Sequence, residues 1–100
     1  MAMTPESKVK KKVREILSKR GAYHTMPVTG GFGMSGAPDI LVCYKGCFVG
    51  IECKANGNRP TALQMKNLIA IDEAGGYAIV VDETSIDTVT SILNHIDSVK

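Results

Sequence analysis

The stretch PDILVCYKGCFVGIECK, residues 38–54, decides the fold, because it has the pattern of a β-hairpin. Two apolar runs, residues 39–44 and 47–54, are separated by the short turn signal Lys45-Gly46. Charged residues stand near the outer ends of both runs. Charges in apolar strands cost stability unless they are paired or bind something, so these positions need an explanation.

The turn predicts which of these charges meet. An even-numbered loop centred between Lys45 and Gly46 pairs Val42 with Val49 and Asp39 with Glu52. Side-chain alternation then places Lys54 on the same sheet face as Glu52. A three-residue loop would slip the pairing by one position and would set Asp39 opposite an apolar side chain.

Two opposed carboxylates need compensation. At ~5 Å and an effective dielectric constant of ~20, Asp39 and Glu52 would repel by roughly 3 kcal/mol. A divalent cation would offset that repulsion, and oxygen ligands suit Mg²⁺ or Mn²⁺. Alternatively, Lys54 neutralises the pair and the three residues form a structural charge cluster. The hairpin geometry leaves both readings open.

The rest of the chain predicts one α/β sheet with helices packed against it, in the order α-β-β-β-α-β-α. Helices are expected over residues 4–20, 61–74 and 85–96, and further strands over 22–28 and 77–82.

Finer details of these elements are also predicted. In the second helix, Met65, Leu68 and Ile69 are expected to face inward. Residues 77–82 have the composition of a buried strand, and Ser85 is a candidate N-cap for the last helix.

Composition narrows the class of protein. One hundred residues, 44% of them apolar, suggest a single globular domain over residues 1–100. Neither a membrane-spanning run nor a signal-peptide pattern is present, so we expect an intracellular protein without a membrane partner. The three cysteines, Cys43, Cys47 and Cys53, lack zinc-site spacing and are expected to be reduced packing residues.

Charge is distributed unevenly along the chain. Residues 1–20 hold seven basic and two acidic residues, a net of +5, whereas residues 21–100 have a net of −3. Such a basic helix suggests a polyanionic partner, although a charged run can equally be a solvated helix face. The spacing Gly31-x-Gly33-x-x-Gly36 leads into a strand rather than a helix, so a mobile loop beside a groove is favoured over a nucleotide site.

These features suit phosphodiester hydrolysis. That reaction needs a metal ion to gather charge on the phosphate and lower the pKa of a water molecule. It also benefits from a nearby cation. Asp39 and Glu52 could hold the metal, Lys54 could supply the cation, and the basic first helix could bind phosphates without reading sequence.

Pro38-Asp39, followed after twelve residues by Glu52-Cys53-Lys54, resembles the signature of the PD-(D/E)xK nuclease superfamily. The element order resembles its restriction-endonuclease-like α-β-β-β-α-β core, a mixed sheet flanked by helices. More narrowly, the chain resembles a minimal stand-alone VRR-NUC domain. The resemblance implies a single VRR-NUC-type nuclease domain over residues 1–100.

The resemblance also implies a wider set of site residues. The family's acidic residue on the first helix matches Glu6, and the glutamine that opens the next helix matches Gln64. Glu6 would orient water or a second metal, and the backbone carbonyl of Cys53 would be a further ligand. Glu6 and Gln64 each have an alternative explanation. The helix dipole favours an acidic residue at position 6, and Thr61-x-x-Gln64 is a capping box.

The family further implies Mg²⁺- or Mn²⁺-dependent cleavage of DNA, often selective for structure. Stand-alone members resemble homodimeric enzymes that cut branched DNA such as four-way (Holliday) junctions. DNA contacts are expected from the basic helix and two loops, namely from Lys10, Lys11, Lys12, Arg14, Ser35 and Arg59. Two other classes remain open: a non-catalytic DNA-binding module of nuclease fold, and a structural protein whose charge cluster only stabilises the sheet.

Overall fold

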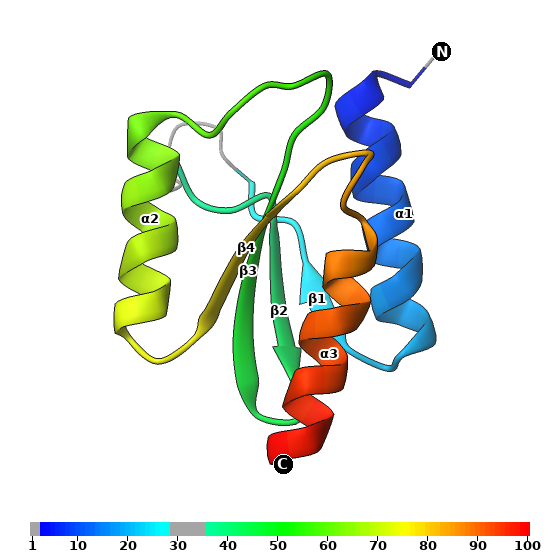
Figure 1. Cartoon of the computed structure of the whole chain (residues 1–100), viewed down its shortest axis with the longest axis vertical. Helices are drawn as coiled ribbons and strands as arrows, with labels where there is room; N and C mark the ends of the chain where they lie inside the picture. The colour runs from blue at the N-terminus through cyan, green and yellow to red at the C-terminus, as the bar shows by residue number, and fades with distance from the viewer. Residues whose placement is uncertain (1–2, 29–35) are drawn as a thin grey trace.

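A four-stranded mixed sheet forms the centre of the computed structural model, which describes residues 3–28 and 36–100 (Figure 1). Its strands are β1 (Tyr23–Thr25), β2 (Ile40–Tyr44), β3 (Cys47–Cys53) and β4 (Tyr77–Val81), in that spatial order. The pairs β1–β2 and β2–β3 are antiparallel, and β3–β4 is parallel. The parallel pair requires a crossover, which the helix between β3 and β4 provides.

The turn between β2 and β3 has two residues, both in the left-handed region. Lys45 has φ 49° and Gly46 has φ 81°, as a type I′ hairpin turn requires. Val42 pairs with Val49, and Ile40 with Ile51. The even-numbered loop and the predicted register are therefore confirmed.

In the described ranges, three helices cover the two faces of the sheet. Helices α1 (Pro5–Lys19) and α3 (Asp87–Val99) lie on one face, and α2 (Ala62–Glu73) lies on the other (Figure 1). The side chain of Thr4 caps α1 by accepting the N–H of Ser7. The observed order confirms the predicted mixed sheet flanked by helices.

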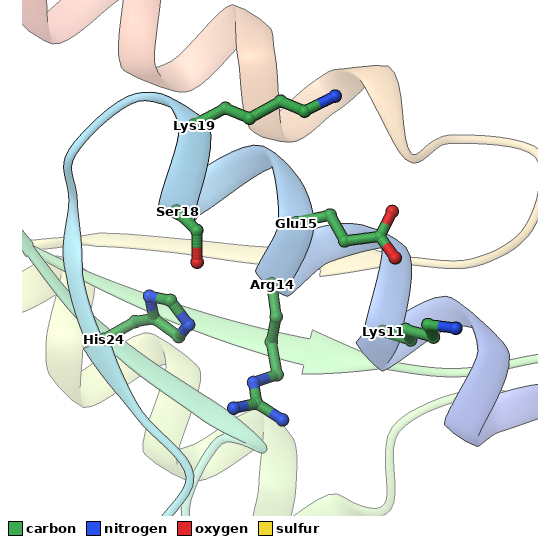
Figure 2. Close-up of a pocket in the computed structure, with 6 residues that line it drawn as sticks. All are labelled: Lys11, Arg14, Glu15, Ser18, Lys19 and His24. Atoms are coloured by element: carbon green, nitrogen blue, oxygen red, sulfur yellow. The ribbon is translucent and has the colours of Figure 1, made fainter.

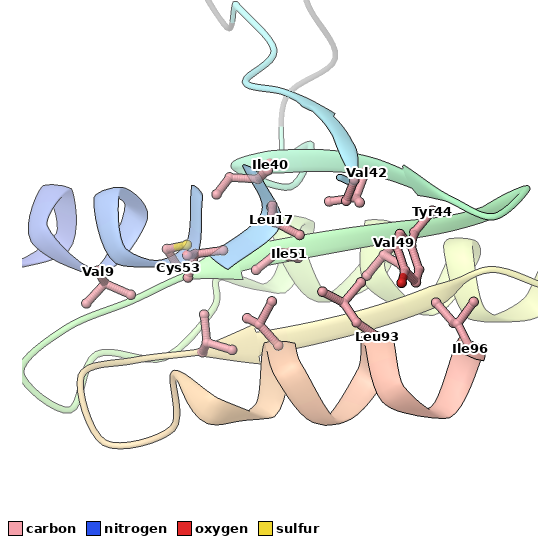
Figure 3. Close-up of a cluster of buried hydrophobic side chains, with 14 of the residues drawn as sticks. Val9, Leu17, Ile40, Val42, Tyr44, Val49, Ile51, Cys53, Leu93 and Ile96 are labelled. Atoms are coloured by element: carbon pink, nitrogen blue, oxygen red, sulfur yellow. The ribbon is translucent and has the colours of Figure 1, made fainter. Parts of the chain in front are cut away.

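The main core lies between the sheet and the α1/α3 layer (Figure 3). Alternate residues of β2 and β3 point into it, as the period of two in a strand dictates. The apolar stripes of the two helices meet them. Its buried members include Val9, Val13, Leu17, Ile40, Val42, Val49, Ile51, Cys53, Val89, Leu93 and Ile96.

The other face of the sheet is covered more thinly by α2. A Cβ atom at Gly50 would lie 2.7 Å from Cδ1 of Ile71 and 3.1 Å from Cγ of Pro38, so glycine permits this close approach. Leu68 is buried as predicted, but the predicted inward positions of Met65 and Ile69 are wrong, since these side chains are 41% and 52% exposed. The close contact with Gly50 turns the Leu68–Ile71 side of α2 toward the sheet.

Two further expectations are corrected. The run over residues 77–82 is not a buried strand, because β4 is an edge strand and only Val81 in it is buried. Ser85 is not the N-cap of α3; that position is Ile86, without a side-chain hydrogen bond. The Ser85 hydroxyl instead accepts the N–H of Asp82 at 3.0 Å, within the turn that precedes the helix.

The remaining expectations concern the length of the first strand, the state of the cysteines, membrane-spanning helices and the glycine-rich segment. The strand expected over residues 22–28 is shorter and spans Tyr23–Thr25. All three cysteines are free, but Cys43 is exposed and only Cys53 is fully buried. In the described ranges, every helix is too short or too polar to cross a membrane. Ser35 and most of the glycine-rich segment lie outside the described residues.

Candidate functional site: an acidic pair at the end of the hairpin

Asp39 is held by the backbone of the strand next to it. Its Oδ2 accepts the N–H of Cys53 at 2.9 Å. Asp39 directly precedes Ile40, which pairs with Ile51, so the register continues to Glu52 as the residue opposite Asp39. The hairpin therefore brings together the two carboxylates that the sequence predicted.

Glu52 is the one buried charged residue in the described part of the chain, with 1% of its surface exposed. Neither of its carboxylate oxygens has a hydrogen-bond partner among the described residues. Burial, followed by the charge of Asp39, raises the pKa of Glu52 to about 7. The site therefore holds a carboxylate whose charge is only partly compensated.

Lys54 provides the nearest compensation for Glu52. Its Nζ lies 3.4 Å from Glu52 Oε2, and its side chain is only 12% exposed. An ion pair this sheltered from solvent is screened less than a surface pair. The predicted trio of Asp39, Glu52 and Lys54 thus forms one cluster at the end of the hairpin.

Helix α1 brings a second lysine to the cluster. Lys10 Nζ lies 3.5 Å from Asp39 Oδ1 and 3.5 Å from Glu6 Oε1. Partial burial lowers the pKa of Lys10. The nearby carboxylates of Asp39 and Glu6 raise it by more, so the pKa lies above its usual value. Glu6 is therefore linked to Asp39 through Lys10.

Sequence reasoning placed Lys10 among the DNA-binding lysines and missed this bridge. The spacing of Glu6 and Lys10, one helical turn apart, could have revealed their ion pair. It could not have revealed the contact with Asp39, because that contact depends on how α1 packs across the sheet.

The backbone of Cys53 faces the acidic pair. Its N–H points toward Asp39, whereas the N–H of Lys54 points to the opposite side and donates to the carbonyl of Val81. Because the N–H and C=O of one residue in a strand share a side, the Cys53 carbonyl also points toward the start of β2. Burial, with the charge of Asp39, raises the pKa of the Cys53 thiol to about 12, so the thiol packs in its neutral form.

Gln64 forms the capping box at the start of α2. Its Oε1 accepts the N–H of Thr61 at 2.9 Å, and its own N–H donates to Oγ1 of Thr61 at 3.2 Å. In the described ranges, no interaction joins Gln64 to Asp39 or Glu52. The structure thus accounts for Gln64 as a cap, and its role in the site stays a prediction.

The basic residues of α1 point in different directions. Lys11 and Arg14 line an open hollow of about 420 Å³ (Figure 2). The hollow is completed by Glu15, Ser18, Lys19 and His24. Lys12 instead lines a different hollow with Lys8, beside Glu83 and Asn56. Arg59 is exposed on the loop before α2.

The acidic pair suits a hard divalent cation. Asp39 Oδ1 is not used by the Cys53 N–H and has Lys10 beside it, and the two Glu52 oxygens lack hydrogen bonds within the described residues. The Cys53 carbonyl points toward the start of β2, where Asp39 lies. No group of three His, Cys, Asp or Glu side chains able to hold a metal occurs in the described ranges. Two carboxylates with water completing the shell are the donor set that Mg²⁺ commonly takes.

The sequence and the fold of this chain were compared with those of known proteins. No protein-family model and no curated protein matches the sequence. A solved structure titled "VRR_NUC domain" superposes with a TM-score of 0.73 at 25% identity, covering 93% of this chain and 98% of its own. The resemblance to a VRR-NUC domain is therefore confirmed.

A second solved structure has the same fold. It is Hjc, a Holliday junction resolvase from the archaeon Archaeoglobus fulgidus, with a TM-score of 0.57 at 19% identity. The superposition covers 74% of this chain and 64% of that one. At this identity the likeness concerns the fold alone.

The buried Glu52 predicts an unusual pH dependence of stability in the absence of metal. Folded Glu52 keeps its proton up to about pH 7, whereas the unfolded chain releases it near 4.5. The unfolded state therefore binds fewer protons in this window, and the free energy of unfolding falls as pH rises through it, by up to about 3 kcal/mol. Urea denaturation between pH 4 and 8 with a chelator measures this loss.

Glu52→Gln removes that titration. We expect the variant to be more stable than the wild type at pH 8 without metal and to show a flatter pH profile. Added Mn²⁺ should stabilise the wild type more than the variant. The exposed Glu15→Gln is the matched control and should follow the wild-type profile. Equal profiles for the wild type and Glu52→Gln would contradict the raised pKa.

Proposed function

We propose that this chain is a divalent-metal-dependent endonuclease that hydrolyses phosphodiester bonds in DNA. The observation that carries the proposal is the buried Glu52 carboxylate, which lies opposite Asp39 and beside Lys54 without a hydrogen-bond partner in the described residues. A purely structural cluster would satisfy these oxygens within the protein. The likeness to a VRR-NUC domain over 93% of the chain supports the same activity.

Each residue of the cluster has a defined part in this proposal. Asp39, Glu52 and the Cys53 carbonyl would hold Mg²⁺ or Mn²⁺, and Glu6 would orient water at the rim. When bound, the cation stabilises the charge on the phosphate and lowers the pKa of the attacking water. Lys54 would place its ammonium beside the same phosphate, in a setting sheltered from solvent.

Gln64 would act from the mouth of α2. Its carbonyl oxygen is engaged by Thr61, so only the amide N–H groups are available to a substrate. Residues 1–100 would constitute one nuclease domain that acts on DNA inside the cell.

Loss of the Asp39 or the Lys54 charge should strongly reduce the rate of DNA cleavage. Asp39→Asn keeps an acceptor for the Cys53 N–H, and Lys54→Gln keeps a polar chain, so both variants should fold. Because Asp39→Asn removes a charged metal ligand and Lys54→Gln removes the cation beside the phosphate, we expect cleavage to fall by about a hundredfold or more. The measurement is a panel of single-stranded, duplex, flap and four-way-junction DNA with Mg²⁺, Mn²⁺ or EDTA.

Lys66→Gln on α2 removes one positive charge away from the site and is the matched control for Lys54→Gln. Wild-type rates for both Asp39→Asn and Lys54→Gln would contradict the proposed site. DNA binding without cleavage of any substrate, together with no divalent binding by calorimetry, would favour the second candidate, a non-catalytic DNA-binding module. Faster cutting of the four-way junction than of duplex DNA would support selectivity for branched DNA.

The hollow beside α1 is the proposed path of the DNA. Lys11, Arg14 and Lys19 line it, and the ion pairs in the described part of the chain involve other cations. Arg14 follows Lys10 by one helical turn, which is ~6 Å along the axis. A DNA strand whose phosphate is cleaved beside Asp39 could therefore continue past the hollow.

The salt dependence of DNA binding tests this path. If Lys11 and Arg14 each contact a phosphate, the double variant Lys11→Gln/Arg14→Gln should lower the slope of log K against log salt by about 2. Lys66→Gln/Lys100→Gln removes the same charge elsewhere and should leave the slope unchanged. Equal effects of the two pairs would mean that net charge, not the hollow, governs binding. Lys12→Gln and Arg59→Gln, measured singly, test their proposed contacts in the same way.

A homodimer is the proposed working form, because two copies would set two sites on two strands of branched DNA. Helix α2 supports it, since Met65 and Ile69 form an exposed apolar pair one turn apart. We expect sedimentation to show a dimer at micromolar concentration. Met65→Glu/Ile69→Lys should yield monomers, whereas the intervening Lys66→Gln should not. A monomeric wild type would remove the junction-cutting proposal but not the nuclease.

A further inference from the structure

Lys10 occupies a position that the proposed function leaves unexplained. Its Nζ lies 3.5 Å from Asp39 Oδ1, the oxygen that is not engaged by the Cys53 N–H. That oxygen is the one Asp39 has left for a divalent cation. An ammonium and a metal ion that both contacted this oxygen would lie close together, so the repulsion between their positive charges would weaken metal binding.

We propose that Lys10 is the counter-ion of the metal-free site and that its ammonium leaves Asp39 when a divalent cation binds. The inference rests on the proposed function and adds a control of metal affinity within the same site. Each acidic residue of the pair has its own lysine: Lys54 lies beside Glu52 on the same strand face, whereas Lys10 reaches Asp39 from another element, α1.

The surroundings of Lys10 give its ammonium a place to go. An open, polar hollow of about 370 Å³ lies beside it. Glu6, one helical turn earlier, lines the same hollow and already lies 3.5 Å from Lys10. Lys10 can therefore release Asp39 while keeping Glu6 as its partner. The far wall is formed by Asn56 and Asn58, on the loop that follows β3.

The displaced ammonium would also serve the substrate. On the rim of the site it is a cation beside the cleaved phosphate, which reconciles its ion pairs with the DNA contact predicted from sequence. Metal binding would then convert Lys10 from a partner of Asp39 into a partner of DNA.

Calorimetric titration of MnCl₂ into the protein without DNA tests the competition. Lys10→Met keeps the length of the side chain but removes the competing charge, so we expect Mn²⁺ affinity to rise about five- to tenfold. Lys12→Met, on another side of the same helix, is the matched control and should change the affinity less than twofold. Unchanged or weaker Mn²⁺ binding by folded Lys10→Met would overturn the inference.

A second measurement separates displacement from simple repulsion. Acetylation of lysines by a small reagent, read by mass spectrometry, reports how accessible each ammonium is in the wild type. We expect the reactivity of Lys10 to rise severalfold with saturating Mn²⁺, whereas the exposed Lys66 should not change. Constant reactivity of Lys10 would overturn displacement.

The outcomes distinguish this inference from the proposed function. A wild type that binds Mn²⁺ and cleaves DNA, with no gain in Lys10→Met, overturns the counter-ion role alone. A wild type that binds no divalent cation overturns both. A gain in Mn²⁺ affinity without cleavage of any DNA keeps the counter-ion role and removes the nuclease.

Discussion

The site depends on the hydrogen bond from the Cys53 N–H to the carboxylate of Asp39, 2.9 Å long. That bond exists because a two-residue turn at Lys45-Gly46 fixes the hairpin register. Side chains in a strand alternate between faces, so a slip of one residue would turn Glu52 into the apolar core. The positions of both carboxylates, and of Lys54 after them, therefore follow from the backbone conformation of two residues at the other end of the hairpin.

This geometry places like charges together and compensates them from two directions. Glu52 is buried and lies opposite Asp39, which is unfavourable in a small sheet. Lys54 lies near Glu52, and Lys10 reaches Asp39 from α1. Neither lysine satisfies the hydrogen-bonding capacity of the Glu52 oxygens, and that deficit is what an added cation would remove. The cluster is thus less stable alone than with the ligand that we propose for it.

The parts of the structure that local chemistry determines could be predicted from sequence. The hairpin register follows from the Lys45-Gly46 turn, and the start of α1 follows from the Thr4 cap. The side of α2 that packs could not be predicted, because its apolar residues are spread around the helix and the choice depends on Ile71 meeting Gly50. The contact of Lys10 with Asp39 could not be predicted for the same reason, since it joins two elements that lie far apart in the sequence.

The end of the sheet remote from the site explains how α1 is held in place. There Asp97 of α3 accepts hydrogen bonds from Tyr44 at 2.8 Å and from Arg20 at 2.7 Å, and it also pairs with Lys45 of the turn. These contacts, led by that of Lys45, lower the pKa of Asp97, so the carboxylate stays charged at neutral pH.

The same carboxylate therefore joins the turn that sets the register, the end of α1 and the last helix. Helix α1 spans fifteen residues, which is ~22 Å, and carries Glu6 and Lys10 at its opposite end. A rigid helix fixed to the turn at one end has a defined position at the other. The residues that anchor the fold and those that carry the proposed chemistry thus lie at opposite ends of α1 and of the hairpin, and Asp97 aligns these two elements so that Lys10 meets Asp39.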